Sequence, residues 1–232
     1  MFKSKKINKI LLLSMAVVAV SFAVDAAQSA EATSPTAVSM DWWKGDEYKK
    51  YAGPQYRSAV SALDSIKFNG NEKVLDIGCG NGAITALEIA RKRVPNGSVV
   101  GLDYSQNMLD TATKEFPIDK VPNLSFIHGN AEDLDFNEEF DVITSFMAFH
   151  WVPNQQKALA GMYKALKPGG KLVLVMIGNP VSYYDDVARD SKWVAKFVKV
   201  PSESGRYFPT ANKFDKWLMD LGFRAIDQIC LP

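Results

Sequence analysis

The 232 residues are 47% hydrophobic and 23% charged, with 15 Gly, 11 Pro and two Cys. This composition is that of an ordinary globular protein and excludes disordered, collagen-like and disulfide-rich classes. The formal net charge of +1 becomes −2 without residues 1–26, which hold four lysines and one aspartate, so no nucleic-acid partner is indicated. The cysteines and histidines form no cluster with metal-ligand spacing, and we predict no metal site.

The N-terminus has the three parts of a secretory signal. Lysines precede an uncharged apolar run from Ile10 to Val24, and small residues suited to processing follow. We therefore predict a signal peptide over 1–26 and export to the periplasm or the medium, with cytoplasmic or membrane-anchored protein as alternatives. The run is shorter than the ~20 residues of a membrane span, so no stable span is expected. We predict that residues 27–40 form a flexible lead-in and that residues 41–232 form a single domain.

Along the domain, short apolar runs alternate with amphipathic stretches. The expected strands are Lys73–Ile77, Ser98–Leu102, Leu124–His128, Phe140–Ser145, Lys171–Met176 and Phe223–Ile229. The expected helices are Tyr56–Ile66, Ala83–Arg93, Ser105–Glu115, Gln155–Leu166 and Phe214–Leu221. Strands separated by helices predict an α/β fold with a doubly wound, mostly parallel sheet covered on both faces. Ligands of such sheets bind beyond the carboxyl ends of the strands.

The residues after the first three expected strands suit a nucleoside. Gly78 and Gly80 lie in a glycine-rich turn between a strand and a helix, where a ligand can approach the backbone closely. Asp103 ends the second strand and can accept hydrogen bonds from a ribose diol. Asn130 and Ala131 follow the third strand, where an amide side chain and a backbone N–H can read an adenine edge.

The charge of Asp76 selects between two kinds of nucleoside ligand. The glycine pattern also fits a dinucleotide fingerprint, but a pyrophosphate would bring negative charge close to this carboxylate. A ligand with an ammonium group is favoured instead, and S-adenosylmethionine has both an ammonium and a sulfonium. A nicotinamide-dependent oxidoreductase is therefore the weaker alternative.

At this point the sequence resembles the class I S-adenosylmethionine-dependent methyltransferases, over about residues 41–230. The resemblance is carried by VLDIGCGNGAIT (74–85), VVGLDYS (99–105), FIHGNAEDLDF (126–136), FDVITSFMAFHWV (140–152) and ALKPGGKLVLV (165–175). It implies that Asp76 and the Gly78 and Gly80 backbone serve the methionine end of the cofactor. It also implies that Asp103 binds the ribose and that Tyr104 packs on the adenine, whose edge meets Asn130 and Ala131.

The segment SFMAFHWVPNQQKAL (145–159) looks like the branch that contains juvenile hormone acid and trans-aconitate methyltransferases, which methylate carboxylates. This likeness, with DWWKGDEYKKYAGPQYRSA (41–59), implies a small-molecule acceptor contacted by His150, Tyr51, Gln55 and Trp151. An ionised carboxylate needs no general base, so His150 would only orient it. For a phenol or enol acceptor, alkylated at oxygen or carbon, His150 would act as the base.

Two features depart from the family resembled. The chain stops at Pro232, where that fold continues into a final strand inserted antiparallel between the fifth and sixth, so we expect a gap there or direct pairing of those two strands. The signal segment is the second departure, because S-adenosylmethionine is made in the cytoplasm. A secreted nucleoside-binding or interaction protein without catalysis is thus a third alternative.

Overall fold

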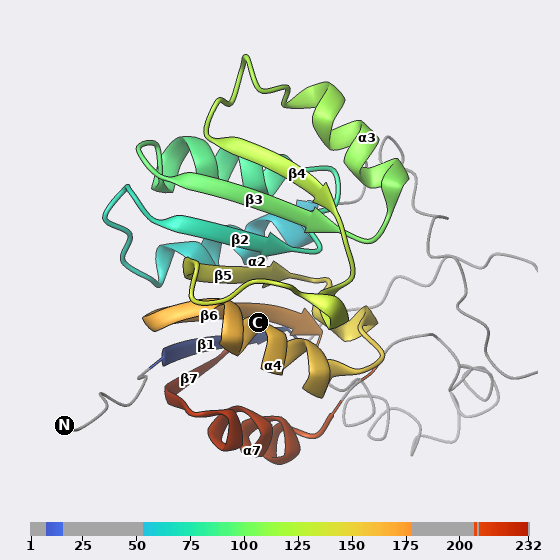
Figure 1. Cartoon of the computed structure of the whole chain (residues 1–232). Coiled ribbons are helices and arrows are strands. Elements are labelled where there is room, and N and C mark those ends of the chain that lie inside the picture. The colour runs from blue at the N-terminus through green and yellow to red at the C-terminus, as the bar shows by residue number, and fades with distance from the viewer. Residues whose placement is uncertain (1–7, 16–52, 178–206, 208, 232) are drawn as a thin grey trace, which may run out of the picture.

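The computed structural model describes residues 8–15, 53–177, 207 and 209–231. Its centre is a seven-stranded sheet in the order β4-β3-β2-β5-β6-β1-β7 (Figure 1). The strands are β1 (Asn8–Met15), β2 (Lys73–Ile77), β3 (Ser98–Asp103), β4 (Leu124–His128), β5 (Phe140–Phe146), β6 (Leu166–Ile177) and β7 (Phe223–Leu231). Every pairing in this sheet is parallel, so the α/β doubly wound prediction is confirmed.

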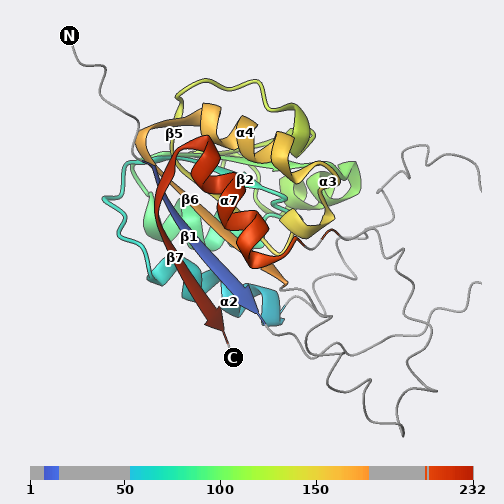
Figure 2. The ribbon, with the colours of Figure 1, turned by 90° about the horizontal axis from the view of Figure 1, so that it is seen from below.

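Helices pack on both faces of the sheet (Figure 2). They are α2 (Gly53–Asp64), η1 (Ile84–Arg93), α3 (Gln106–Glu115), α4 (Gln155–Ala165) and α7 (Ala211–Leu221), with the short 3₁₀ turns η2 (Ala131–Asp133) and η3 (Phe149–Trp151). One apolar cluster joins the sheet to α2 and η1, and a second joins it to α4 and α7. Because both faces are covered, the strands carry consecutive apolar residues such as Val74-Leu75 and Val142-Ile143. No helix in the described ranges is long and apolar enough to cross a membrane.

Polar caps set the helix boundaries close to those predicted. The Ser105 hydroxyl accepts a hydrogen bond from the Met108 N–H at the start of α3, and Asn154 and Thr210 cap α4 and α7 in the same way. At the end of α7, Gly222 adopts a φ of 107°, a left-handed conformation that glycine takes without strain. The local capping chemistry thus supports the expected alternation of strands and helices.

The N-terminal segment differs most from expectation. Asn8–Met15, inside the stretch predicted to be a removable signal, forms β1 between β6 and β7. The position where the fold resembled carries its final antiparallel strand is therefore filled by a parallel strand from the other end of the chain, and neither a gap nor direct pairing of β6 with β7 is seen. An uncharged apolar run suits a signal core and a buried parallel strand equally well. The predicted lead-in, 27–40, lies outside the described residues.

Candidate active site

The carboxyl ends of β2, β3, β4 and β5 lie next to one another because these strands are neighbours in the sheet. The loop after β2 is tied to the end of β3: the N–H groups of Gly78 and Cys79 donate to the Leu102 carbonyl at 2.7 and 3.0 Å. The end of β4 is attached to the end of β3 by Gly129, whose N–H donates to the Asp103 carbonyl. The residues predicted to bind a nucleoside therefore share one edge of the sheet.

The three loop glycines all have positive φ, but their surroundings differ. A Cβ on Gly78 would lie 2.2 Å from the Ala148 Cβ, and one on Gly82 would lie 2.7 Å from the Phe126 ring. A Cβ on Gly80, at φ +56°, would meet no atom of the described residues within 4 Å. Two glycines therefore permit close packing within the protein, whereas no described residue packs against Gly80, and a ligand can approach its backbone there.

Asp103 holds the open part of this loop. Its Oδ2 accepts a hydrogen bond from the Gly80 N–H at 2.7 Å, and its Oδ1 accepts one from the Ser105 N–H at 2.9 Å. The backbone N–H groups around this carboxylate do not use all of its acceptor sites, so the half-buried side chain can still receive a hydroxyl. Burial raises the pKa of Asp103, and the backbone hydrogen bonds from Ser105, Gly80 and Tyr104 oppose that rise.

Asp76 lies in β2, just before the loop, and is 2% exposed. Its carboxylate accepts hydrogen bonds from the hydroxyls of Thr85, on η1, and Thr144, on β5, at 2.6 and 2.7 Å. Burial raises the pKa of Asp76 to about 6, against the lowering effect of these two hydroxyls. Neither threonine was expected from the sequence, because the contact depends on how β2 pairs with β5 and packs on η1.

The residues predicted around the adenine lie at the ends of β3 and β4. The Tyr104 side chain is 43% exposed, and its ring lies 6.0 Å from that of His128. His128 Nε2 lies within hydrogen-bond distance of the Tyr104 carbonyl, at 2.8 Å. The Asn130 Oδ1 accepts from the Glu132 N–H, which fixes the side chain at the start of η2 beside the buried Ala131.

On the acceptor side, His150 and Trp151 lie in η3, after β5, with ring centroids 5.6 Å apart. The His150 side chain is buried, at 2% exposure, and Trp151 is half-buried. Gln55 lies in the first turn of α2, whereas Tyr51 lies outside the described residues. The close approach of Ala148 to Gly78 places η3 directly against the loop that follows β2.

Gln155 is a site-forming residue that the sequence analysis missed. Its buried Nε2 donates to the carbonyls of Phe149 and Tyr207, at 3.1 and 3.0 Å. The Tyr207 N–H in turn donates to the His150 carbonyl at 2.7 Å. These bonds attach the backbone just before α7 to η3. A glutamine at the start of a helix gives no sequence signal for such a contact.

The backbone between β5 and η3 is strained. Met147 has a φ of 58°, which is uncommon for a residue with a side chain. Its N–H donates to the Val175 carbonyl of β6 at 2.7 Å. Strain of this kind is retained where the surrounding structure holds it, frequently beside a functional site, and the bond to β6 holds Met147 here.

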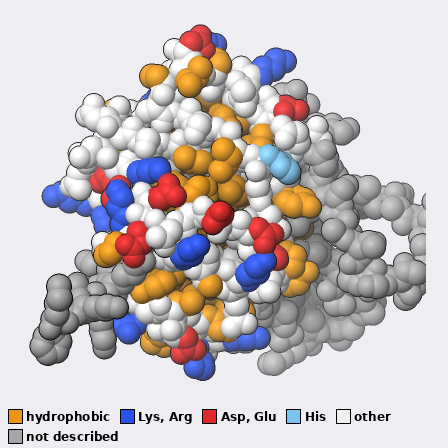
Figure 3. Space-filling model, in the orientation of Figure 1, with side chains coloured by type: hydrophobic (Ala, Val, Ile, Leu, Met, Phe, Trp, Pro, Cys, Tyr) orange, Lys and Arg blue, Asp and Glu red, His pale blue; other side chains and the backbone are white. Residues whose placement is uncertain are grey.

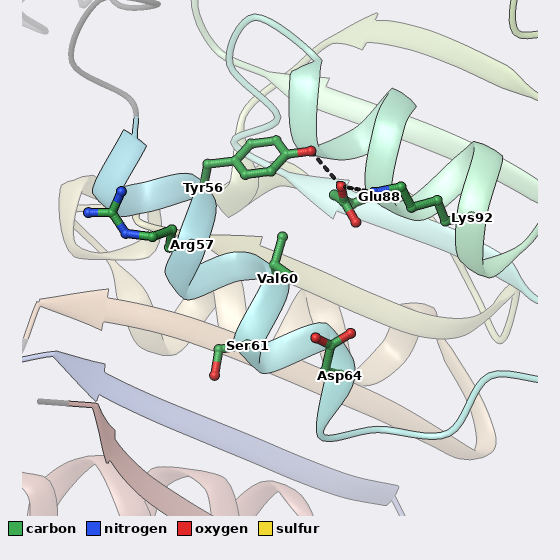
Figure 4. A pocket seen from close by; sticks show the side chains of 7 residues that line it. All are labelled: Tyr56, Arg57, Val60, Ser61, Asp64, Glu88 and Lys92. Carbon is green, nitrogen blue, oxygen red and sulfur yellow. Dashed lines mark hydrogen bonds and ion pairs between the residues drawn. The ribbon is translucent and has the colours of Figure 1, made fainter.

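A hollow between α2 and η1 is separate from these strand ends (Figure 4). Tyr56 points from α2 toward Glu88 on η1, and the Tyr56 hydroxyl donates to the carboxylate at 2.5 Å. Burial raises the pKa of Glu88, but hydrogen bonds from Lys92, Tyr56 and Arg93 outweigh it and hold that pKa below its usual value. The same bond and burial raise the pKa of Tyr56 to about 12. We interpret this network as the attachment of α2 to η1.

The outer face over α4 and α7 mixes acidic and basic side chains (Figure 3). Ion pairs join Lys157 to Asp133 and Lys216 to Asp220. Alternating charges of this kind produce no field of one sign over the face, which agrees with the absence of a basic bias in the sequence.

Comparison with known proteins connects this geometry to a family. The chain is 34% identical over 170 residues to a demethylmenaquinone methyltransferase of Listeria welshimeri, a match that covers 67% of this chain and 72% of that protein. Residues 74–170 match the family model of a methyltransferase domain. The chain belongs to the S-adenosylmethionine-dependent methyltransferase family. The alternatives of a nicotinamide-dependent oxidoreductase and of a non-catalytic binding protein are not favoured by these matches.

Two further matches are to other proteins named as methyltransferases. A malonyl-[acyl-carrier protein] O-methyltransferase of Priestia megaterium is 33% identical over 135 residues, which cover 57% of this chain and 47% of that protein. A Haemonchus contortus phosphoethanolamine N-methyltransferase 2, solved with S-adenosyl-L-methionine, matches at a TM-score of 0.57 and 21% identity, over 77% of this chain and 40% of that one. The latter shows a shared fold. The chain spans less than two thirds of the length of several curated relatives.

The methyltransferase's own residues fit S-adenosylmethionine. No described residue packs over Gly80, and the Asp103 carboxylate beside it keeps acceptor capacity for a ribose hydroxyl. Asp76 supplies negative charge under the loop when it is ionised, which suits the ammonium and sulfonium of this cofactor. The assignments of Gly80 and Asp103 to the cofactor stay predictions.

Proposed function

We propose that this methyltransferase transfers the methyl group of S-adenosylmethionine to the oxygen of a small organic carboxylic acid. The observation that carries the proposal is the contact between Gly78 and Ala148, which joins the open loop at Gly80 to η3. A methyl donor held over Gly80 and an acceptor held by η3 would then be neighbours, as direct transfer requires.

The chain's own residues would bind and orient the two reactants. Asp103 would receive the ribose hydroxyls, and Asn130 with Ala131 would meet the adenine edge, while Asp76 balances the positive charge of the methionine end. The cofactor supplies an electrophilic methyl group on a sulfonium. His150 would orient the acceptor as a hydrogen-bond donor, with Gln55, Trp151 and Tyr51 completing the pocket. Because His150 is buried, this contact would form in a site from which water is excluded.

Two considerations support a carboxylate acceptor. A carboxylate is already ionised at neutral pH and requires no general base. The Priestia relative is, by its name, an O-methyltransferase that acts on a malonyl group. Methyl transfer to a carboxylate depends on placing the two reactants correctly and on excluding water, and less on proton transfer.

A second candidate acceptor is a phenol or enol, and the name of the Listeria relative, demethylmenaquinone methyltransferase, favours it. With such an acceptor a proton must be removed for the oxygen or carbon to attack the methyl group. His150 would then act as the general base. The two candidates therefore differ in whether the imidazole accepts a proton.

Single-turnover methyl transfer by wild type and His150→Gln, across pH 5–9, tests the choice. The acceptor panel holds fatty, isoprenoid and tricarboxylic acids beside phenols and quinols. Transfer to an acid with modest loss in the variant supports the proposal. Transfer only to phenols or quinols, with a loss of roughly 100- to 10,000-fold in the variant, overturns it in favour of the second candidate.

A further inference from the structure

The N-terminal strand occupies an interior position in the sheet (Figure 2). Residues 9–15 of β1 pair in register with residues 171–177 of β6, and residues 8–15 also pair with β7. β6 and β7 are not paired with each other. Neighbouring strands lie about 4.8 Å apart, so β6 and β7 stand roughly 10 Å apart, too far for direct hydrogen bonds. Without β1, both strands would expose unpaired backbone groups to the gap.

The support that β1 gives reaches the candidate active site in two steps. Leu13 of β1 pairs with Val175 of β6, and the carbonyl of Val175 accepts the hydrogen bond from the strained Met147. Met147 immediately precedes Ala148, which packs on Gly78. Loss of β1 would therefore loosen the strand that holds the junction between the cofactor loop and η3.

The same residues belong to the lysine-rich and apolar pattern of an export signal. A given segment cannot lie between β6 and β7 while it is engaged by an export apparatus or after it has been cleaved off. We propose that the space between β6 and β7 is a strand-binding slot whose ligand is the chain's own residues 8–15. A molecule that keeps residues 8–15 in this slot can bind the cofactor. Export takes the segment out of the slot and so prevents cofactor binding.

This arrangement connects location to activity. A chain that folds with β1 in place keeps its N-terminal segment and stays in the compartment where the cofactor is made. A chain whose segment is captured during synthesis loses the strand between β6 and β7. The test of competence measures cofactor binding, and in that respect it rests on the proposed function. The position of β1 can be measured without any cofactor.

Crosslinking in the full chain tests the position. Ser14 and Cys230 are register partners on β1 and β7, so Ser14→Cys places two thiols on adjacent strands, where a short bifunctional thiol reagent joins them. We expect an intramolecular crosslink between positions 14 and 230, identified by peptide mass, in most molecules. The variant with Cys230→Ser as well should give none. No crosslink, or one between two copies, overturns the assignment of the slot to the same chain.

A proline tests competence in the full chain. Leu12→Pro removes an N–H from the middle of an interior strand, which such strands do not tolerate. We expect loss of cooperative unfolding, or S-adenosylhomocysteine affinity at least tenfold weaker, while Ala37→Pro, outside β1, leaves both unchanged. Wild-type unfolding and affinity in Leu12→Pro would overturn the slot. Cofactor binding by Ser14→Cys without any crosslink between positions 14 and 230 would overturn the slot alone and leave the proposed function standing.

Discussion

Gly78 and Ala148 approach so closely that a Cβ on the glycine would lie 2.2 Å from the alanine Cβ. The two residues follow different strands, β2 and β5, which are neighbours in the sheet. Their contact therefore makes the cofactor loop and η3 one packed unit. Gly80, two residues further on, has no such neighbour among the residues with a described position, and the two glycines should respond differently to the same substitution.

Gly78→Ala and Gly80→Ala form a matched pair for this reason. Both place a side chain at positive φ, which costs roughly 1–2 kcal/mol. Gly78→Ala adds the collision with Ala148 and should destabilise the fold by clearly more. Gly80→Ala should fold but bind S-adenosylhomocysteine more weakly, because the methyl group enters the ligand's space. Denaturant unfolding and calorimetry would separate the two effects, and equal loss of stability in both variants would contradict the distinction.

Asp103→Ala and Asp103→Asn should weaken cofactor binding in a folded protein. A hydrogen bond to a charged group contributes about 1.5–3 kcal/mol, so the loss of one ribose contact corresponds to at least a tenfold rise in Kd. Asp110→Asn, on the exposed side of α3, is a control of the same chemistry. Unchanged affinity in both Asp103 variants would remove this residue from the site.

The pKa of Asp76 makes folding stability depend on pH. Because burial raises this pKa to about 6 in the folded protein, against about 3.9 in the unfolded chain, the folded state holds more protons between those values. The contribution of Asp76 to stability is therefore largest below pH 4 and decreases as pH rises to 6, by about 3 kcal/mol.

Asp76→Asn removes this dependence while keeping a group that can bond both Thr85 and Thr144. We expect the difference in unfolding free energy, wild type minus variant, to fall between pH 4 and 6 and to stay level above pH 7. Urea unfolding at a series of pH values measures it. A difference that stays constant over this range would show that the carboxyl titrates normally in the folded state.

Ser145 is fully buried at the end of β5, and its hydroxyl has no hydrogen-bond partner among the residues the structure describes. A buried polar group without a partner costs about 1–3 kcal/mol. Ser145→Ala should therefore leave stability unchanged or raise it by about 1 kcal/mol. Ser58→Ala is the matched control, because the buried Ser58 hydroxyl donates to the Pro54 carbonyl and its loss should destabilise. A clear loss of stability in Ser145→Ala would reveal a hydrogen bond at this position.

The strand ends that carry Gly80, Asp103 and Asn130 could be located from the sequence. Apolar runs of strand length are readable, and parallel strands bring their carboxyl ends to one edge. The partners of Asp76 could not be located in this way. Thr144 is 68 residues away from Asp76, and only the pairing of β2 with β5 brings the two side chains together. Strand register and helix packing are properties of the whole fold rather than of any local pattern.

The N-terminal strand shows a different limit. Ile10 to Val24 satisfies the composition of a signal core, and a chain with lysines before such a run is ordinarily assigned to export. The composition of a buried parallel strand is the same, and only the space between β6 and β7 reveals the second use. Gln155 illustrates the same limit on a smaller scale, because its two carbonyl partners come from η3 and from residue 207.

The bonds that attach Tyr207 to η3 have a consequence for how η3 responds to change elsewhere in the fold. The Gln155 amide, on α4, donates to the carbonyls of both Phe149 and Tyr207, so one side chain connects three segments of the chain. A substitution at Gln155 would therefore act on η3 and on the backbone at Tyr207 at the same time.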